Sequence, residues 1–148
     1  MFRRRPGGME VLLVHPGGPF FRNKDAGAWS IPKGEVEPGE DVPTAARREF
    51  EEELGVRIDS AQPLLELSPV KIKSGKIIHA RAIEGDVDTT TVTSNTFTME
   101  WPPRSGRQIT FPEIDRAEFF PLAEARRRIN PGQMPLIDEL EGLLGLYP

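Results

Sequence analysis

The chain has 148 residues and a mass of 16.5 kDa, which predicts one domain spanning residues 1–148 with a substantial core. The absence of cysteine excludes a disulfide scaffold, a cysteine nucleophile and a thiolate zinc site. Two histidines, His15 and His79, are too few for a multi-histidine metal centre. The formal net charge of −4 argues against general nucleic-acid binding. No apolar run approaches the roughly 20 residues of a membrane helix, and no apolar region follows the basic start, so we expect a cytoplasmic protein without membrane contact.

The first half of the chain predicts one buried strand and one helix. Pro32 disfavours helix before it, Pro43 suits a first helical turn, and Gly55 suits a left-handed helix cap. The expected elements are, in order, a basic first strand or a loose end at 1–8, a buried strand at 9–15, a loop at 20–28, a short extended segment at 29–31, a turn-rich loop at 34–41 and a helix at 43–54.

The second half predicts further strands followed by two helices. Leucine and isoleucine recur at helical spacing in the last segment, which predicts a helix with one apolar face. The expected elements are strands at 64–67 and 71–83 around a turn at 74–75, a loop at 84–91, a strand at 96–101, a second loop at 102–106, a strand at 117–120 and helices at 122–129 and 133–144. This order predicts an α/β sandwich with a mixed central sheet.

One short window holds most of the acidic character. Residues 34–56 carry a charge of about −6, whereas the rest of the chain is nearly neutral. The acids in this window are Glu35, Glu37, Glu40, Asp41, Glu49, Glu51, Glu52 and Glu53. A run of acidic residues is ordinarily the solvated face of a helix. Whether this run has a function therefore depends on the order of its residues.

On the expected helix, three carboxylates share one side. Glu49, Glu52 and Glu53 fall within an arc of roughly 100°, next to the core stripe of Phe50 and Leu54. Like charges this close repel each other, and a divalent cation offsets the repulsion. Carboxylate oxygens suit the hard ions Mg²⁺, Mn²⁺ or Ca²⁺.

The spacing of the window matches a known motif. Gly34 is followed by five residues and Glu40, and seven more lead to Arg48-Glu49-Phe50-Glu51-Glu52-Glu53-Leu54-Gly55-Val56. This pattern resembles the Nudix box position for position, and the preceding residues 29–34 look like the family's lead-in segment. The chain is therefore identified as a candidate member of the Nudix hydrolase family, in its MutT-like form.

The resemblance implies a fold, a reaction and a cofactor. The fold is an α/β/α sandwich, and the reaction is Mg²⁺- or Mn²⁺-dependent hydrolysis of a nucleoside diphosphate linked to another moiety. The metal ligands implied are Glu49, Glu52, Glu53, the carbonyl of Gly34 and a further loop carboxylate, for which Glu113 is the candidate. Glu40 and Arg48 brace the loop, and Glu49 is the first candidate for the general base.

Several other residues are candidates for substrate binding. Lys33 either reaches a phosphate oxygen or is a solvated lysine. Trp29 and Trp101 either stack on a base or pack within the protein. Arg104 either grips phosphates, together with Arg107, or lies in a solvated loop.

The sequence restricts the range of possible substrates only in part. The loop at 36–41 looks like the box loop of diadenosine polyphosphate hydrolases, but the tyrosine usual 16 to 18 residues past the box is replaced by Ile72, Lys73 and Ser74. Lys71 stands where ADP-ribose hydrolases carry proline. A nucleoside triphosphate or a dinucleoside polyphosphate is favoured. A non-catalytic Nudix module that senses a nucleotide or binds a partner, and an acidic helix that binds only Ca²⁺, are the alternatives. A homodimer is left open.

Overall fold

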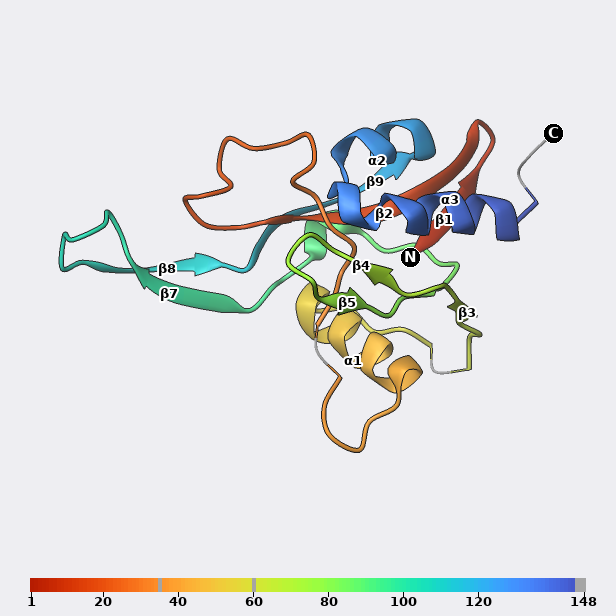
Figure 1. Ribbon diagram of the computed structural model, residues 1–148, viewed down its shortest axis with the longest axis horizontal. Helices are drawn as coiled ribbons and strands as arrows, with labels where there is room; N and C mark the ends of the chain where they lie inside the picture. The colour runs from red at the N-terminus through yellow and green to blue at the C-terminus, as the bar shows by residue number, and fades with distance from the viewer. Residues whose placement is uncertain (35, 60, 146–148) are drawn as a thin grey trace.

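The computed structural model describes residues 1–34, 36–59 and 61–145, and its centre is a three-stranded antiparallel sheet (Figure 1). The order is β1 (Phe2–Arg5), β2 (Gly8–Pro16) and β9 (Ile114–Pro121). β2 is the middle strand: Val11 pairs with Phe2 on one side and with Phe120 on the other. The basic start is thus a first strand, and the strand predicted at 117–120 begins three residues earlier.

Helices cover both faces of β2. Val11 and Leu13 join a cluster that contains α2 (Leu122–Arg128) and α3 (Met134–Leu143), through residues such as Ile137. Leu12 and Val14 join a second cluster with α1 (Val42–Leu54). The alternation of side chains along a strand therefore places α1 on one side and α2 with α3 on the other, as the predicted sandwich requires.

The segment between α1 and the last strands is more broken than predicted. In place of strands at 64–67 and 71–83, it forms four two-residue strands, namely β3 (Leu65–Glu66), β4 (Val70–Lys71), β5 (Ile77–Ile78) and β6 (Arg81–Ala82). β3 pairs with β6 and β4 with β5. A parallel bridge between Phe2 and Glu84 joins this segment to β1 and gives the fold its mixed character.

A second hairpin extends away from the body (Figure 1). β7 (Thr96–Glu100) pairs with β8 (Gln108–Pro112) in register, and β9 follows directly. β8 was not predicted because its sequence, Gln-Ile-Thr-Phe-Pro, is short and ends in proline. Two single turns complete the fold, at Thr89–Thr91 and Pro131–Gln133.

α1 has defined ends close to the prediction. The Asp41 carboxylate caps it by accepting a hydrogen bond from the Thr44 N–H. Gly55 ends it with φ of 69°, a left-handed conformation that favours glycine. The Leu54 carbonyl accepts a hydrogen bond from the Thr93 N–H, so the helix end is attached to the segment that leads into β7.

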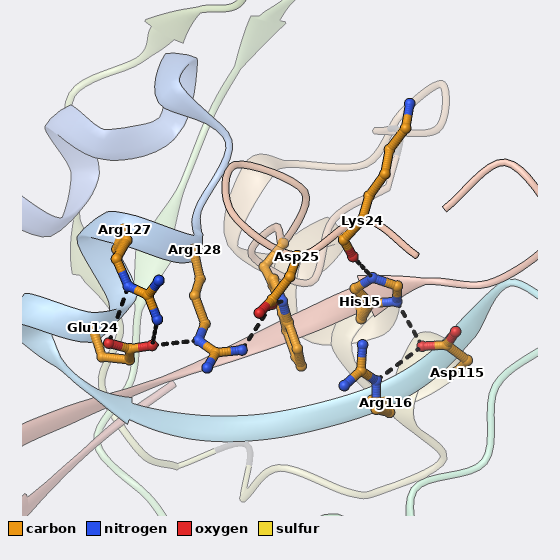
Figure 2. A network of polar contacts seen from close by, with 9 residues as sticks. His15, Lys24, Asp25, Asp115, Arg116, Glu124, Arg127 and Arg128 are labelled. Atoms are coloured by element: carbon orange, nitrogen blue, oxygen red, sulfur yellow. Dashed lines mark hydrogen bonds and ion pairs between the residues drawn. The ribbon is translucent and has the colours of Figure 1, made fainter. Parts of the chain in front are cut away.

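The loop at 17–28 is tied down by polar contacts with residues of β2, β9 and α2 (Figure 2). His15 is fully buried, and its ring nitrogens lie 2.7 Å from Asp115 Oδ1 and 2.7 Å from the Lys24 carbonyl oxygen. Asp25 accepts hydrogen bonds from the Trp29 indole and from Arg128, each at 2.7 Å. These contacts hold the loop against β2, β9 and α2.

Glycine is required at the end of α1. A methyl group on Gly55 would come within 2.2 Å of Thr93 Oγ1 and 2.9 Å of the Thr93 carbonyl oxygen. Gly39 also has positive φ, but a methyl group there meets nothing within 4 Å. We predict that Gly39→Ala costs about 1 kcal/mol of unfolding free energy, and Gly55→Ala at least about 2 kcal/mol. Urea denaturation checks both, and equal losses would contradict the packing argument.

Candidate functional site

One pocket of about 560 Å³ brings together most of the residues predicted to act in the site. The lead-in loop contributes Lys33 and Gly34, and α1 contributes Glu49, Glu52 and Glu53. Glu113 enters from the turn between β8 and β9. All the side chains predicted as metal ligands therefore line one pocket, although they come from three separate parts of the chain.

Gly34 lies against the carboxylate of Glu49. A methyl group built on Gly34 would fall 1.9 Å from both Cδ and Oε2 of Glu49. Any side chain at this position would therefore displace the Glu49 carboxylate. The glycine of the motif is explained by this close approach of backbone to carboxylate.

Arg48 connects the loop to the helix. Its guanidinium donates to both carboxylate oxygens of Glu40, at 2.8 and 2.9 Å. The same side chain donates to Glu49 Oε1 at 2.8 Å and to Glu52 Oε2 at 3.0 Å. The hydrogen bonds from Arg48 hold the pKa of Glu40 at about 2. Arg48 makes the contacts that a brace requires and does not line the pocket.

Glu53 is the most perturbed acid of the site. Burial raises its pKa to about 7, against the lowering effect of the Lys33 N–H, which donates to Glu53 Oε2 at 2.9 Å. The charges of Glu49 and Glu113 raise the pKa further. Several carboxylates therefore crowd into one pocket, at a cost that a bound cation would remove.

The donor set fits a hard divalent cation. In the described parts of the chain, no three acidic, histidine or cysteine side chains are already grouped closely enough to hold a metal ion. The pocket nevertheless offers oxygen ligands from four carboxylates, and the exposed Gly34 backbone adjoins Glu49. Oxygen-only ligation suits Mg²⁺ or Mn²⁺.

The predicted substrate-binding residues divide into three groups. Lys33 is exposed and lines the pocket. The stacking role predicted for Trp29 is wrong: the side chain is 0% exposed, and its ring packs edge-on to His15 and Phe120, which leaves no face for a base. Trp101 and Arg104 lie at the far end of the β7–β8 hairpin and do not line the pocket.

The sequence reasoning missed two features of the site. Asn95 lines the pocket, and its carbonyl accepts a hydrogen bond from the Glu113 N–H at 2.8 Å. A second, mainly apolar cavity of about 370 Å³ shares the walls Lys33, Gly34 and Glu49 with the first. In the sequence, only the polar pair Ser94-Asn95 before β7 pointed, weakly, to a role for Asn95. No sequence signal pointed to the cavity, because α1, α3 and the broken strands build it jointly.

Comparison with protein families gives a match to the NUDIX domain over residues 1–140. Among curated proteins, an RNA pyrophosphohydrolase of Erythrobacter litoralis is 44% identical over 56 residues, 34% of each chain. Nudix hydrolase 7 of Arabidopsis thaliana is 42% identical over 55 residues, 37% of this chain and 19% of the relative. The chain thus spans about a third or less of the length of these relatives.

Solved structures match over nearly the whole chain. A Caenorhabditis elegans Ap4A hydrolase gives a TM-score of 0.65 at 19% identity, covering 99% of this chain and 95% of that one. The ORF135 protein of Escherichia coli gives 0.56 at 25% identity, covering 99% and 89%. A MutT/nudix family protein of Listeria innocua gives 0.59 at 17% identity, covering 97% and 88%. These likenesses confirm the predicted fold.

None of the helices in the described part of the chain combines the length and the apolar character that crossing a bilayer needs.

The raised pKa of Glu53 predicts how stability depends on pH. Its folded-state pKa of about 7 lies above the ordinary value of 4.5, so the folded chain binds more protons between these values and loses stability as pH rises through this window. In chelator-containing buffer, Glu53→Gln should therefore raise Tm at pH 8 by roughly 3 °C or more, and change it little at pH 4.5.

The matched control is Glu52→Gln, because the Glu52 side chain is 52% exposed. Its effect on Tm should be similar at both pH values. A Glu53→Gln chain that is no more stable than the wild type at pH 8 would contradict the burial of this carboxylate.

Proposed function

The chain belongs to the Nudix family, and we propose that it hydrolyses the diphosphate bond of a nucleoside diphosphate linked to another moiety. The cofactor would be Mg²⁺ or Mn²⁺, and the substrate a nucleoside triphosphate or a dinucleoside polyphosphate. The observation that carries the proposal is the convergence of Glu49, Glu52, Glu53 and Glu113 on one pocket beside Lys33.

The carboxylates would hold the metal. Glu52 and Glu53 would be its most direct ligands, and Glu49, Glu113 and the Gly34 carbonyl would complete the set. When bound, the cation supplies charge neutralisation of the phosphate oxygens and acidifies a water molecule. Without it, the same carboxylates would repel a diphosphate.

The remaining work falls to this chain's own residues. Glu49 is the first candidate to accept the proton of the attacking water, because Gly34 fixes its carboxylate from one side and Arg48 from the other. Glu113 is the second candidate, because it lines the same pocket. Lys33 places a positive charge at the pocket rim for a phosphate oxygen.

The adjoining cavity provides room for a nucleoside. It shares Lys33, Gly34 and Glu49 with the carboxylate pocket, so a group attached to the bound diphosphate enters it directly. Its volume of about 370 Å³ is in the range of small-molecule sites. Similar proteins carry the names RNA pyrophosphohydrolase and Ap4A hydrolase, which is consistent with a nucleotide substrate.

The first experiment measures hydrolysis across a panel with Mg²⁺, with products identified by mass spectrometry. The panel holds canonical and oxidised nucleoside triphosphates, diadenosine tetraphosphate, ADP-ribose and a nucleotide sugar. Glu53→Gln should lower turnover of the active compound about 100-fold or more. Glu51→Gln is the control, because Glu51 accepts a hydrogen bond from the Ile58 N–H and does not line the pocket.

If no compound is hydrolysed, binding measurements distinguish two explanations. If no compound is cleaved with Mg²⁺ or Mn²⁺ but one binds, the chain is a nucleotide-sensing module. If metal alone binds and no nucleotide does, the acidic helix is only a cation site. Either outcome would overturn the proposed hydrolysis.

A second prediction concerns Gly34. The methyl group of Gly34→Ala would displace the Glu49 carboxylate, and misplacement of a catalytic group by about 1 Å costs on the order of 100-fold in rate. Gly39→Ala, in the same loop, has open space and should keep its activity. Equal activity of the two variants would remove Glu49 from the mechanism.

A further inference from the structure

The β7–β8 hairpin forms an arm that begins and ends at the carboxylate pocket. Asn95 and Glu113, which flank it, both line the pocket. Five residue pairs separate this base from the far end, from Thr96–Pro112 to Glu100–Gln108, and span about 14 Å. In the described residues, β7 and β8 pair only with each other, so the arm projects from the body (Figure 1).

One side of the arm is aromatic and is covered by the loop at 17–28. Phe97 and Trp101 are half-buried, whereas the residues that alternate with them are exposed. Gly18 packs on the Phe97 ring, where an added methyl group would come within 2.8 Å. The Phe20 ring lies edge-on to Trp101 with centroids 5.5 Å apart. Phe20 is nevertheless 59% exposed, so this end of the molecule presents aromatic surface to solvent.

The same end carries arginines without partners. Arg22 lies in the loop, and Arg104 and Arg107 lie at the tip of the arm; all three are exposed. Across the described residues, none of the three guanidinium groups makes a hydrogen bond or ion pair. The tip itself is ordered, since Trp101 N–H donates to the Arg107 carbonyl and Arg104 N–H donates to Glu100 Oε1.

Exposed aromatic rings next to unpaired arginines suit a nucleobase joined to phosphates. The rings offer a stacking surface, and the guanidinium groups offer charge to the phosphate chain. A diphosphate at the carboxylates is too short to place its nucleoside at the tip, whereas a longer polyphosphate carries a second nucleoside that far. The net charge of −4 disfavours a long nucleic acid that would track the surface beyond this patch.

We propose that Phe20, Trp101 and Arg104 bind the second nucleoside of a dinucleoside polyphosphate whose cleaved diphosphate lies at the carboxylate pocket. The inference rests on the proposed function and deepens it. The proposed site holds the distal base, and it selects substrates by the length of their phosphate chain.

The test compares substrates with and without the second nucleoside. Wild-type protein with Mg²⁺ is given diadenosine tri- and pentaphosphate, each beside the adenosine polyphosphate of the same phosphate number. The pentaphosphate pair should differ about tenfold in kcat/KM in favour of the dinucleoside, and the triphosphate pair should differ little. A gain that is absent, or equal at both lengths, would overturn the proposal.

Substitutions in the arm test which residues bind the second nucleoside. Trp101→Ala should raise KM for diadenosine pentaphosphate about tenfold with kcat unchanged, and leave adenosine pentaphosphate unaffected. Arg104→Ala should cause a smaller, salt-sensitive loss. Phe21→Ala and Arg57→Ala are the matched controls, since Phe21 packs with Lys24 and Arg57 follows α1. If a variant lost activity equally toward both substrates, or if the control variants also lost activity, the substituted residues would act through folding and not through the second nucleoside.

Fluorescence separates this inference from the proposed hydrolysis. Trp29 is fully buried and Trp101 is half-buried, so stacking should quench Trp101 selectively. With Ca²⁺ in place of Mg²⁺, so that a hard cation still offsets the carboxylate charges, diadenosine pentaphosphate should quench the emission, and Trp101→Phe should abolish the response, whether or not the chain proves to be a hydrolase. If a 5′-triphosphorylated oligoadenylate quenches and the dinucleoside does not, the surface binds RNA and the proposal is wrong.

Discussion

The burial of both faces of β2 is the constraint on which the rest of the structure depends. Its side chains alternate between two apolar clusters, so α1 must lie on one side and α2 with α3 on the other. Val14 also exchanges backbone hydrogen bonds with Ser30, which fixes the segment that leads to Gly34. Gln133 fixes it from the other side, because its side-chain oxygen accepts a hydrogen bond from the Ile31 N–H. The core therefore sets the position of the loop that faces the Glu49 carboxylate.

Within the carboxylate pocket, a second constraint comes from electrostatic repulsion. Carboxylates that are to hold a cation must lie close together before it binds, and their repulsion opposes folding. Arg48 relieves part of this repulsion by bonding Glu40, Glu49 and Glu52 at once. Glu53 is instead the buried member of the group, and its burial raises its pKa to about 7. The positive charge of Arg48 thus offsets part of the cost of grouping these carboxylates.

Local signals in the sequence were enough to predict that the helix carboxylates lie together, but not the surfaces around them. Pro43, the glutamates and Gly55 lie within 23 residues, and helical periodicity alone places Glu49, Glu52 and Glu53 on one side. Trp29 was misjudged because neither periodicity nor spacing shows that the segment after a loop returns into the core, where Asp25 accepts its indole hydrogen. The turn at 74–75 was predicted, but the strand expected to continue to residue 83 is divided, because β5 pairs with β4 whereas β6 pairs with β3.

The arm and the loop at 17–28 illustrate how tertiary contacts extend a short motif. Glu113 reaches the pocket only because Gly17, Asn95 and β9 fix the turn that carries it: the Gly17 N–H donates to the Glu113 carbonyl, and the Glu113 N–H donates to Asn95. The buried His15 in turn anchors the loop through the Lys24 carbonyl. Because the backbone at Gly17 and Gly18 supports both the base of the arm and its aromatic face, a deletion in this part of the loop would act on Glu113 and Trp101 together. The carboxylate pocket and the aromatic end of the arm are therefore coupled through one element, although about 14 Å of paired hairpin separates them.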